Sequence, residues 1–134
     1  ALPAAATLPA PRAAIDRCFF RGGVEEVESA LAREGSEWAR KTLAAMAGKS
    51  PTSQKIAFRQ LREGTALDFD ACMVMEYRLS QHIMAAHDFF EGVRALIIDK
   101  DNTPRWRPGT LAAVDDTMVN GYFAPLGAAD LTFD

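Results

Sequence analysis

The chain has 134 residues, of which 49% are apolar and 25% charged, and its formal net charge is −3. This composition is that of an ordinary globular domain, and the lack of excess Lys and Arg excludes non-specific nucleic-acid binding. No apolar run approaches the roughly 20 residues that cross a bilayer, so we expect neither a membrane nor a nucleic-acid partner. Cys18 and Cys72 lie in helical patterns, which favours buried thiols and a cytoplasmic location over a disulfide.

The first residues have a composition of their own. Residues 1–11 contain only Ala, Leu, Pro and Thr, and their three prolines disfavour a stable helix. We therefore interpret residues 1–12 as an interdomain linker or a cut edge. Residues 13–134 are expected to form one helical domain that belongs to a longer protein.

Four helices are predicted in the first half of the chain. Apolar residues recur at helical spacing in segments 12–20, 24–34, 37–47 and 51–63. Gly35 is a candidate C-terminal cap for the second of these helices. Ser36 and Ser50 are candidate N-terminal caps for the next two, and Pro51 suits the first helical position.

The longest periodic segment spans residues 68–86. One apolar stripe and a second stripe beside it predict a helix that is packed on two sides. The first stripe contains Phe69, Cys72, Met75, Leu79, Ile83 and Ala86, and the second contains Met73, Tyr77 and Met84. We expect one stripe to face the core of the domain and the other to face a partner.

A corner at His87-Asp88 is expected to separate this helix from another over residues 89–98. Asp88 precedes an apolar pair, and Glu91 follows three residues later, which is the pattern of a capping box with Asp88 as the N-cap. Pro104 lies beyond the end of the second helix, which it could not continue. The short run Leu96–Ile98 is ambiguous between helix and strand.

Beyond Trp106, the sequence predicts a turn at Pro108-Gly109 and a last short helix from about Asp115 that Pro125 ends. No strand-like alternation is found apart from the ambiguous run. The predicted fold class is therefore all-α, a compact bundle of about six or seven helices.

Candidate metal ligands are poorly spaced. His82 and His87 are five residues apart, whereas a zinc-binding pair on a helix usually sits at i and i+4. Neither cysteine has a Cys or His partner at ligand spacing. We prefer capping and surface roles for both histidines, Asp88 and Glu91, and predict no metal site.

Two charged segments have alternative interpretations. Arg105-Trp106-Arg107 could contact a phosphate, but a solvated loop anchored by its Trp is the preferred interpretation. Glu76 and Arg78 lie among apolar neighbours. A partly buried ion pair with residues such as Arg94 or Glu91 is preferred there over a general base.

Segments 50–64, 75–81, 87–106 and the tail 125–133 resemble the C-terminal region of the 3-hydroxyisobutyryl-CoA hydrolase family, a branch of the enoyl-CoA hydratase/isomerase (crotonase) superfamily. Asp88-Phe89, Glu91–Ala95 and Asp99–Asp101 fall in one continuous register. The resemblance implies a helical C-terminal domain that covers the acyl-CoA site and takes part in subunit contacts. The parent enzyme would hydrolyse a short hydroxyacyl-CoA thioester, as in valine breakdown.

That family's core, oxyanion-hole segments and catalytic acids lie upstream of the matching region, so no catalytic residue is assigned and this chain alone is expected to be inactive. The implied partners are that N-terminal crotonase core and further copies of the chain. No cofactor is implied, coenzyme A being part of the substrate. In crotonases a Lys after the corresponding helix approaches the CoA phosphates. Lys100 is the nearest match, although its spacing from Glu91-Gly92 differs by a single residue.

Two alternatives remain open on the residues alone. The parent could be an enoyl-CoA hydratase or isomerase of the same superfamily. The chain could also be a free-standing helical interaction module without catalysis.

Overall fold

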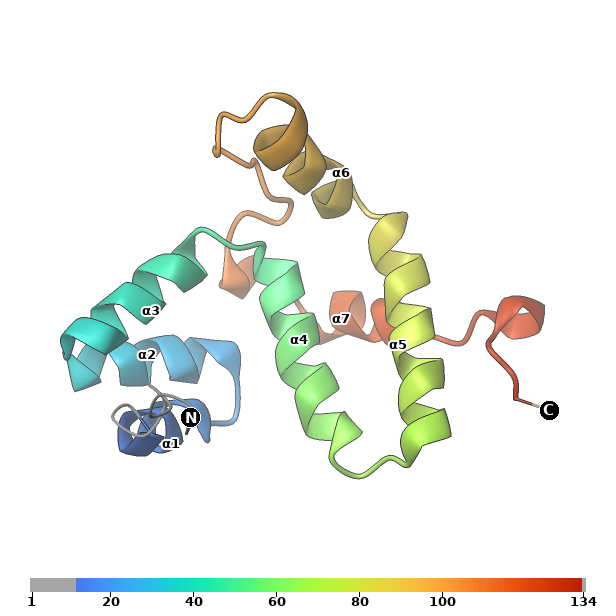
Figure 1. Ribbon diagram of the computed structural model, residues 1–134, viewed down its shortest axis with the longest axis horizontal. Coiled ribbons are helices and arrows are strands. Elements are labelled where there is room, and N and C mark those ends of the chain that lie inside the picture. Colours follow the sequence, from blue (N-terminus) through green and yellow to red (C-terminus); the bar gives the residue numbers. More distant parts are fainter. Residues whose placement is uncertain (1–11, 134) are drawn as a thin grey trace, which may run out of the picture. The chain divides into compact units, whose positions relative to one another are not determined.

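The computed structural model describes residues 12–133, which form seven α-helices and three short helical turns, with no strand among them (Figure 1). The predicted all-α fold class is thus confirmed. The chain divides into two compact units, residues 1–49 and 50–134, and each is described by itself. Most of the predicted linker, residues 1–11, lies outside the described residues.

The first unit is a three-helix arrangement of α1 (Arg12–Phe19), α2 (Val24–Glu34) and α3 (Glu37–Ala47). Helix α2 packs against both of the others. The buried side chains are small or aliphatic: Cys18, Val24, Val27, Ala30, Leu31 and Ala39. At one edge, Arg17 donates through Nη2 to Glu34 Oε1 at 2.9 Å and through Nε to Oε2 at 3.3 Å, which ties α1 to the end of α2.

The predicted caps of this unit are present. Gly35 has φ 63° in the left-handed region, and its N–H donates to the Leu31 carbonyl at 3.3 Å. Ser36 Oγ accepts from the Ala39 N–H at 3.2 Å and so begins α3. Helices 24–34 and 37–47 therefore have the boundaries that the sequence predicts.

The second unit is built on α4 (Pro51–Gly64), α5 (Phe69–Met84) and α7 (Asp116–Phe123). Helix α7 packs against both α4 and α5 and closes the space between them (Figure 1). The core lies where they meet and contains Ile56, Met75, Leu79, Val114 and Val119. Burying an apolar side chain of this size contributes about 1.5–3 kcal/mol, so each member of this cluster stabilises the unit.

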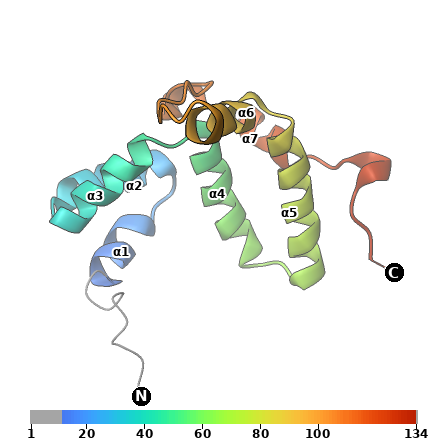
Figure 2. The same ribbon diagram turned by 45° about the horizontal axis from the view of Figure 1, so that its top comes forward.

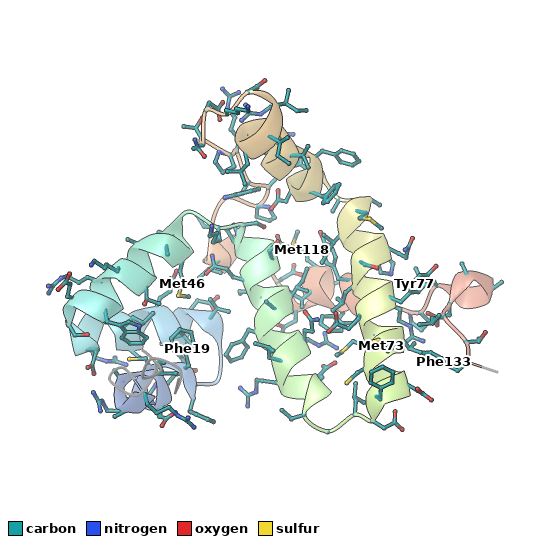
Figure 3. All side chains as sticks on the ribbon, viewed as in Figure 1. Phe19, Met46, Met73, Tyr77, Met118 and Phe133 are labelled. Atoms are coloured by element: carbon teal, nitrogen blue, oxygen red, sulfur yellow. The ribbon has the colours of Figure 1, made fainter. Side chains whose placement is uncertain are left out.

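Helix α5 is capped by Asp68, whose Oδ1 accepts from the Ala71 N–H at 2.9 Å. Its first stripe is buried in the middle, at Met75 and Leu79, and exposed at its start, where Phe69 is 73% exposed. Of the second stripe, Met73 and Tyr77 are half-buried (Figure 3). The helix is therefore apolar around most of its circumference but deeply buried only on the side of α7.

The predicted partners of Glu76 and Arg78 were wrong. Glu76 accepts from Gln60 Nε2 on α4 at 2.8 Å, and Arg78 donates from Nε to Asp130 Oδ1 at 2.8 Å. Asp130 lies in the segment after α7, beyond the short 3-10 turn η3 (Gly127–Ala129). Because this segment folds back along α5, it supplies the carboxylate that the sequence did not place there.

The predicted corner is present but lies at Ala85-Ala86 rather than at His87-Asp88, and the predicted Asp88 cap was wrong. Helix α6 (His87–Val93) begins at His87, with Ala86 at the cap position and no side-chain cap bond. Asp88 therefore lies within the first turn rather than before it. The helix continues as a π-helical turn, η1 (Arg94–Ile98), which resolves the ambiguous run as helical. Figure 2 shows α6 nearly end-on above α4 and α5.

A 3-10 turn, η2 (Leu111–Ala113), precedes α7, and the Arg107–Pro108 peptide bond before it is cis. Asp115 caps α7 by accepting from the Met118 N–H at 2.8 Å. Among residues 12–133, no helix combines the length and the apolar character that a membrane span requires.

Candidate functional site

Most of the candidate site residues that the sequence suggested lie in α6, in η1 and in the exit loop, residues 99–107. Arg94, the first residue of η1, donates from Nε and Nη2 to Glu91 at 3.0 and 2.8 Å. Its Nη1 donates to Asp99 Oδ2 and Asp101 Oδ2, each at 2.7 Å. Since a guanidinium offers five N–H donors in one plane, one side chain holds three carboxylates and draws the loop back towards the helix.

This network shifts the pKa values of Glu91, Asp101 and Arg94. The pKa of Glu91 is lowered from 4.5 to about 2, chiefly by its hydrogen bonds from Arg94 and then by the Arg105 N–H. The pKa of Asp101 is lowered from 3.8 to about 2 by Arg94 and the Thr103 N–H. The same carboxylates raise the pKa of Arg94. All of these groups stay charged at neutral pH, as suits a structural network rather than proton transfer.

Asp88 and Glu91, which resemble a capping box, bind the exit loop instead. Glu91 Oε1 accepts from the Arg105 N–H at 2.7 Å, and Asp88 Oδ1 accepts from the Arg107 N–H at 2.8 Å. The loop therefore runs antiparallel to α6. We call these two carboxylates and two N–H groups the clasp.

The clasp also reaches helix α4. Asp88 Oδ2 accepts from Ser50 Oγ at 2.5 Å, while the same Oγ caps α4 by accepting from the Ser53 N–H at 3.1 Å. The Asp88 side chain is only 10% exposed. One carboxylate thus connects the start of α4, the start of α6 and the exit loop.

Trp106 lies between the two clasped residues and is half-buried. Its ring packs over Gly92, so that a Cβ added to Gly92 would lie 3.5 Å from Trp106 Cη2. The preferred interpretation of Arg105-Trp106-Arg107, a solvated loop anchored by its Trp, is confirmed.

The π-helical turn η1 lies between Glu91-Gly92 and Lys100. The Asp99 N–H donates to the Arg94 carbonyl at 2.8 Å, an i+5 hydrogen bond that encloses one residue more than an α-helical turn. Lys100 is exposed and has φ 56°, in the left-handed region that Lys rarely adopts. The strain is held because Arg94 binds the carboxylates on both sides of it.

The remaining candidates lie apart. His82 Nε2 is 3.1 Å from the Ala124 carbonyl, and His87 Nδ1 is 3.0 Å from Asp88 Oδ1. Cys18 is buried, and Cys72 Sγ is 3.7 Å from the Gly64 carbonyl. Within the part of the chain that the structure describes, no group of three His, Cys, Asp or Glu residues is arranged to hold a metal ion.

The chain belongs to the enoyl-CoA hydratase/isomerase family, whose model matches residues 2–123. The curated relatives include members of the branch that the sequence resembles, the 3-hydroxyisobutyryl-CoA hydrolases. The chain is 48% identical over 118 residues to the mitochondrial 3-hydroxyisobutyryl-CoA hydrolase of Danio rerio, covering 88% of this chain and 31% of that protein. It is 45% identical over 119 residues to the mitochondrial human hydrolase, covering 89% and 31%. The chain therefore spans less than a third of the length of these relatives.

Solved structures agree with the fold. A carnitinyl-CoA dehydratase from Mycobacterium thermoresistibile superposes with a TM-score of 0.92 at 31% identity, over 100% of this chain and 38% of that one. An enoyl-CoA hydratase from Rhodobacter sphaeroides superposes with a TM-score of 0.85 at 36% identity, over 99% of this chain and 41% of that one. The resemblance predicted from the sequence is confirmed.

Proposed function

We propose that this chain is the C-terminal helical domain of a 3-hydroxyisobutyryl-CoA hydrolase, which cleaves a CoA thioester to a carboxylic acid and free coenzyme A in valine catabolism. The supporting observation is the 48% identity to a curated hydrolase over 88% of the chain. The domain helps to cover the acyl-CoA site of an upstream crotonase core and contributes to subunit contacts. The cytosolic location predicted from the sequence stays a prediction, since the curated relatives are named as mitochondrial proteins.

A second candidate is an enoyl-CoA hydratase or isomerase of the same superfamily. Its support is the 36% identity to the enoyl-CoA hydratase from Rhodobacter sphaeroides. The hydrolase is preferred because the identity to curated hydrolases is higher. A free-standing interaction module is the third alternative, and it requires that no crotonase core accompany the chain.

The test uses the product of the complete reading frame that encodes this chain. With 3-hydroxyisobutyryl-CoA and a thiol reagent, we expect release of free thiol, and with a 2-enoyl-CoA we expect no loss of the enoyl thioester absorbance. Hydration without thiol release would overturn the hydrolase proposal in favour of the second candidate. The 134-residue chain alone should release thiol only at background rate, because acyl transfer needs an oxyanion site and a positioned acid or base.

We further propose that the isolated chain self-associates. Phe90, Leu96, Ile97 and Ile98 are 62%, 58%, 65% and 69% exposed, which is unusual for neighbouring large apolar residues. Hiding roughly 400 Å² per chain, about 800 Å² in a dimer, would contribute on the order of 20 kcal/mol, against association costs of about 4–15 kcal/mol and the ordering of side chains at the interface. We therefore expect a micromolar or weaker dimer. Light scattering that gives the mass of one chain at every concentration into the millimolar range would contradict this.

A further inference from the structure

The segment after α7, residues 124–133, is attached to the rest of the second unit at few points. Ala124 donates its N–H to the Gly121 carbonyl at 3.3 Å, and its own carbonyl lies 3.1 Å from Nε2 of His82 on α5. Beyond Ala124, no residue up to Phe133 is buried, and none belongs to the core cluster of the unit. The segment is therefore anchored at its start and lies on the surface from there on (Figure 1).

One ion pair joins the rest of this segment to α5. Arg78 donates through Nε to both carboxylate oxygens of Asp130, at 2.8 and 3.0 Å, and through Nη2 to Oδ2. Residues 125–133 make no other hydrogen bond or ion pair with a described residue outside the segment. The two side chains are 27% and 17% exposed, so water reaches the pair and limits its strength. The attachment of the segment to α5 therefore depends on a single contact of moderate strength.

The segment is held together by bonds of its own. The N–H groups of Ala129 and Asp130 donate to the carbonyls of Leu126 and Gly127, at 3.2 and 3.1 Å, and form the turn η3. The Asp130 carboxylate also accepts from the Leu126 backbone N–H. Gly127 has φ 62°, a conformation that glycine adopts without strain. Because none of these bonds involves α5, the turn can keep its shape when the ion pair breaks, and the segment can move as one piece.

The two contacts with α5 give the direction of the segment. The first contact is with His82 and the second with Arg78, one helical turn nearer the start of α5, so the segment runs antiparallel to the helix. The preceding turn of α5 carries Val74 on the same face, and Val74 is half-buried. Leu131, which follows the ion pair, is also half-buried. We therefore expect Leu131 to lie over Val74 when the segment is docked.

We propose that residues 125–133 form a strap that opens and closes over α5, with the Arg78–Asp130 ion pair as its latch. The closed strap covers Val74. The open strap exposes Val74 and Leu131 and frees the Arg78 guanidinium, while α4, α5 and α7 keep their packing. Segments with few buried apolar contacts open locally before the whole domain unfolds, and this strap has none that is fully buried.

The test is ¹⁵N relaxation of the whole 134-residue chain, which measures backbone motion on the picosecond to nanosecond timescale. In the wild type we expect order parameters of about 0.85 for residues 126–131, as for rigid backbone. Arg78→Gln and, separately, Asp130→Asn should lower them to below about 0.6. Nuclear Overhauser effects between the methyl groups of Leu131 and Val74 should be present in the wild type and lost in both variants.

Arg59→Gln is the matched control. Arg59 is an arginine of similar exposure, 33%, that pairs with Glu63 and Asn120 and lies 4.1 Å from the centroid of the Phe123 ring. None of these partners belongs to the strap. Arg59→Gln should therefore leave the order parameters of residues 126–131 unchanged.

A charge exchange tests the latch itself. Arg78→Asp combined with Asp130→Arg re-forms the ion pair in the opposite sense, and it should restore both the order parameters of the strap and its methyl contact with α5. Raising the salt concentration should loosen the strap in the wild type, because the ion pair is partly exposed.

A strap that stays rigid in both single variants, or that loosens equally in the Arg59 control, would overturn the proposal. A further refutation would be the loss of the native core signals of Ile56 and Val119 in Asp130→Asn. The segment would then be part of the core of the unit and not a separate strap.

Discussion

Removing Asp88 should destabilise the second unit, and for a different reason from the one its sequence suggests. It does not cap α6. Asp88→Ala would instead remove the acceptor for Ser50 Oγ and for the Arg107 N–H. The start of α4 and one end of the exit loop would lose their common partner.

The expected loss of stability in Asp88→Ala follows from these two hydrogen bonds. Hydrogen bonds to a charged group contribute about 1.5–3 kcal/mol each, and water can replace the carboxylate at the exposed Arg107 N–H. The Ser50 bond is the better shielded of the two, because Ser50 is 5% exposed. We therefore expect Asp88→Ala to lower the free energy of unfolding by about 2–3 kcal/mol.

Asp70→Ala supplies a matched control. Asp70 is the second residue of α5, as Asp88 is of α6, but it is exposed. Its loss should cost only the helix-dipole interaction, about 0.3–1 kcal/mol. Urea unfolding followed by Trp106 fluorescence, in a Trp38→Phe background, compares the two variants. Equal midpoints would refute the clasp as a source of stability.

Two further predictions concern pH and a cap. Glu91 and Asp101 have lowered pKa values of about 2, so their contribution is complete above roughly pH 4.5 and is lost as the pH falls through about 2. The urea concentration at the midpoint of unfolding should therefore decrease as the pH is lowered from about 4.5 to 2.5. Glu91→Gln should make this decrease smaller. Gly35→Ala places a side chain at φ 63° and should cost the first unit about 1 kcal/mol, whereas Gly48→Ala, at φ −85°, should not. Thermal unfolding followed through Trp38 fluorescence would check this pair.

The sequence predicted those parts of the fold that local chemistry decides. Apolar periodicity located the helices, and Ser36, Ser50 and Gly35 marked boundaries that the structure reproduces. At each of these positions the helix end has one available partner, the neighbouring side chain or glycine. Local rules are sufficient where no distant group competes.

They fail at Asp88 because a distant group does compete. The same carboxylate could accept from the first N–H groups of α6 or from the Arg107 N–H and the Ser50 hydroxyl. Nothing in the spacing of Asp88 and Glu91 distinguishes the two. Arg78 is similar, since its partner Asp130 is 52 residues away. The residues of the exit loop give no signal for their pairing with α6, because the loop donates through backbone N–H groups, which every residue except Pro carries.

The arrangement of the exposed apolar residues of η1 determines the shape of the surface that could bury them. Successive residues in a helical turn are about 80–100° apart around the axis, so Leu96, Ile97 and Ile98 together present apolar surface over roughly half the circumference. A flat face of a second copy would cover one side and leave the rest in water. A concave surface would cover all three, and the much longer relatives contain more than twice as much additional chain from which to form one. Self-association of the isolated chain and docking onto an upstream core therefore compete for the same residues. The concave partner should bind more tightly because it buries more apolar area, and the complete enzyme should contain η1 in an intramolecular interface rather than between copies.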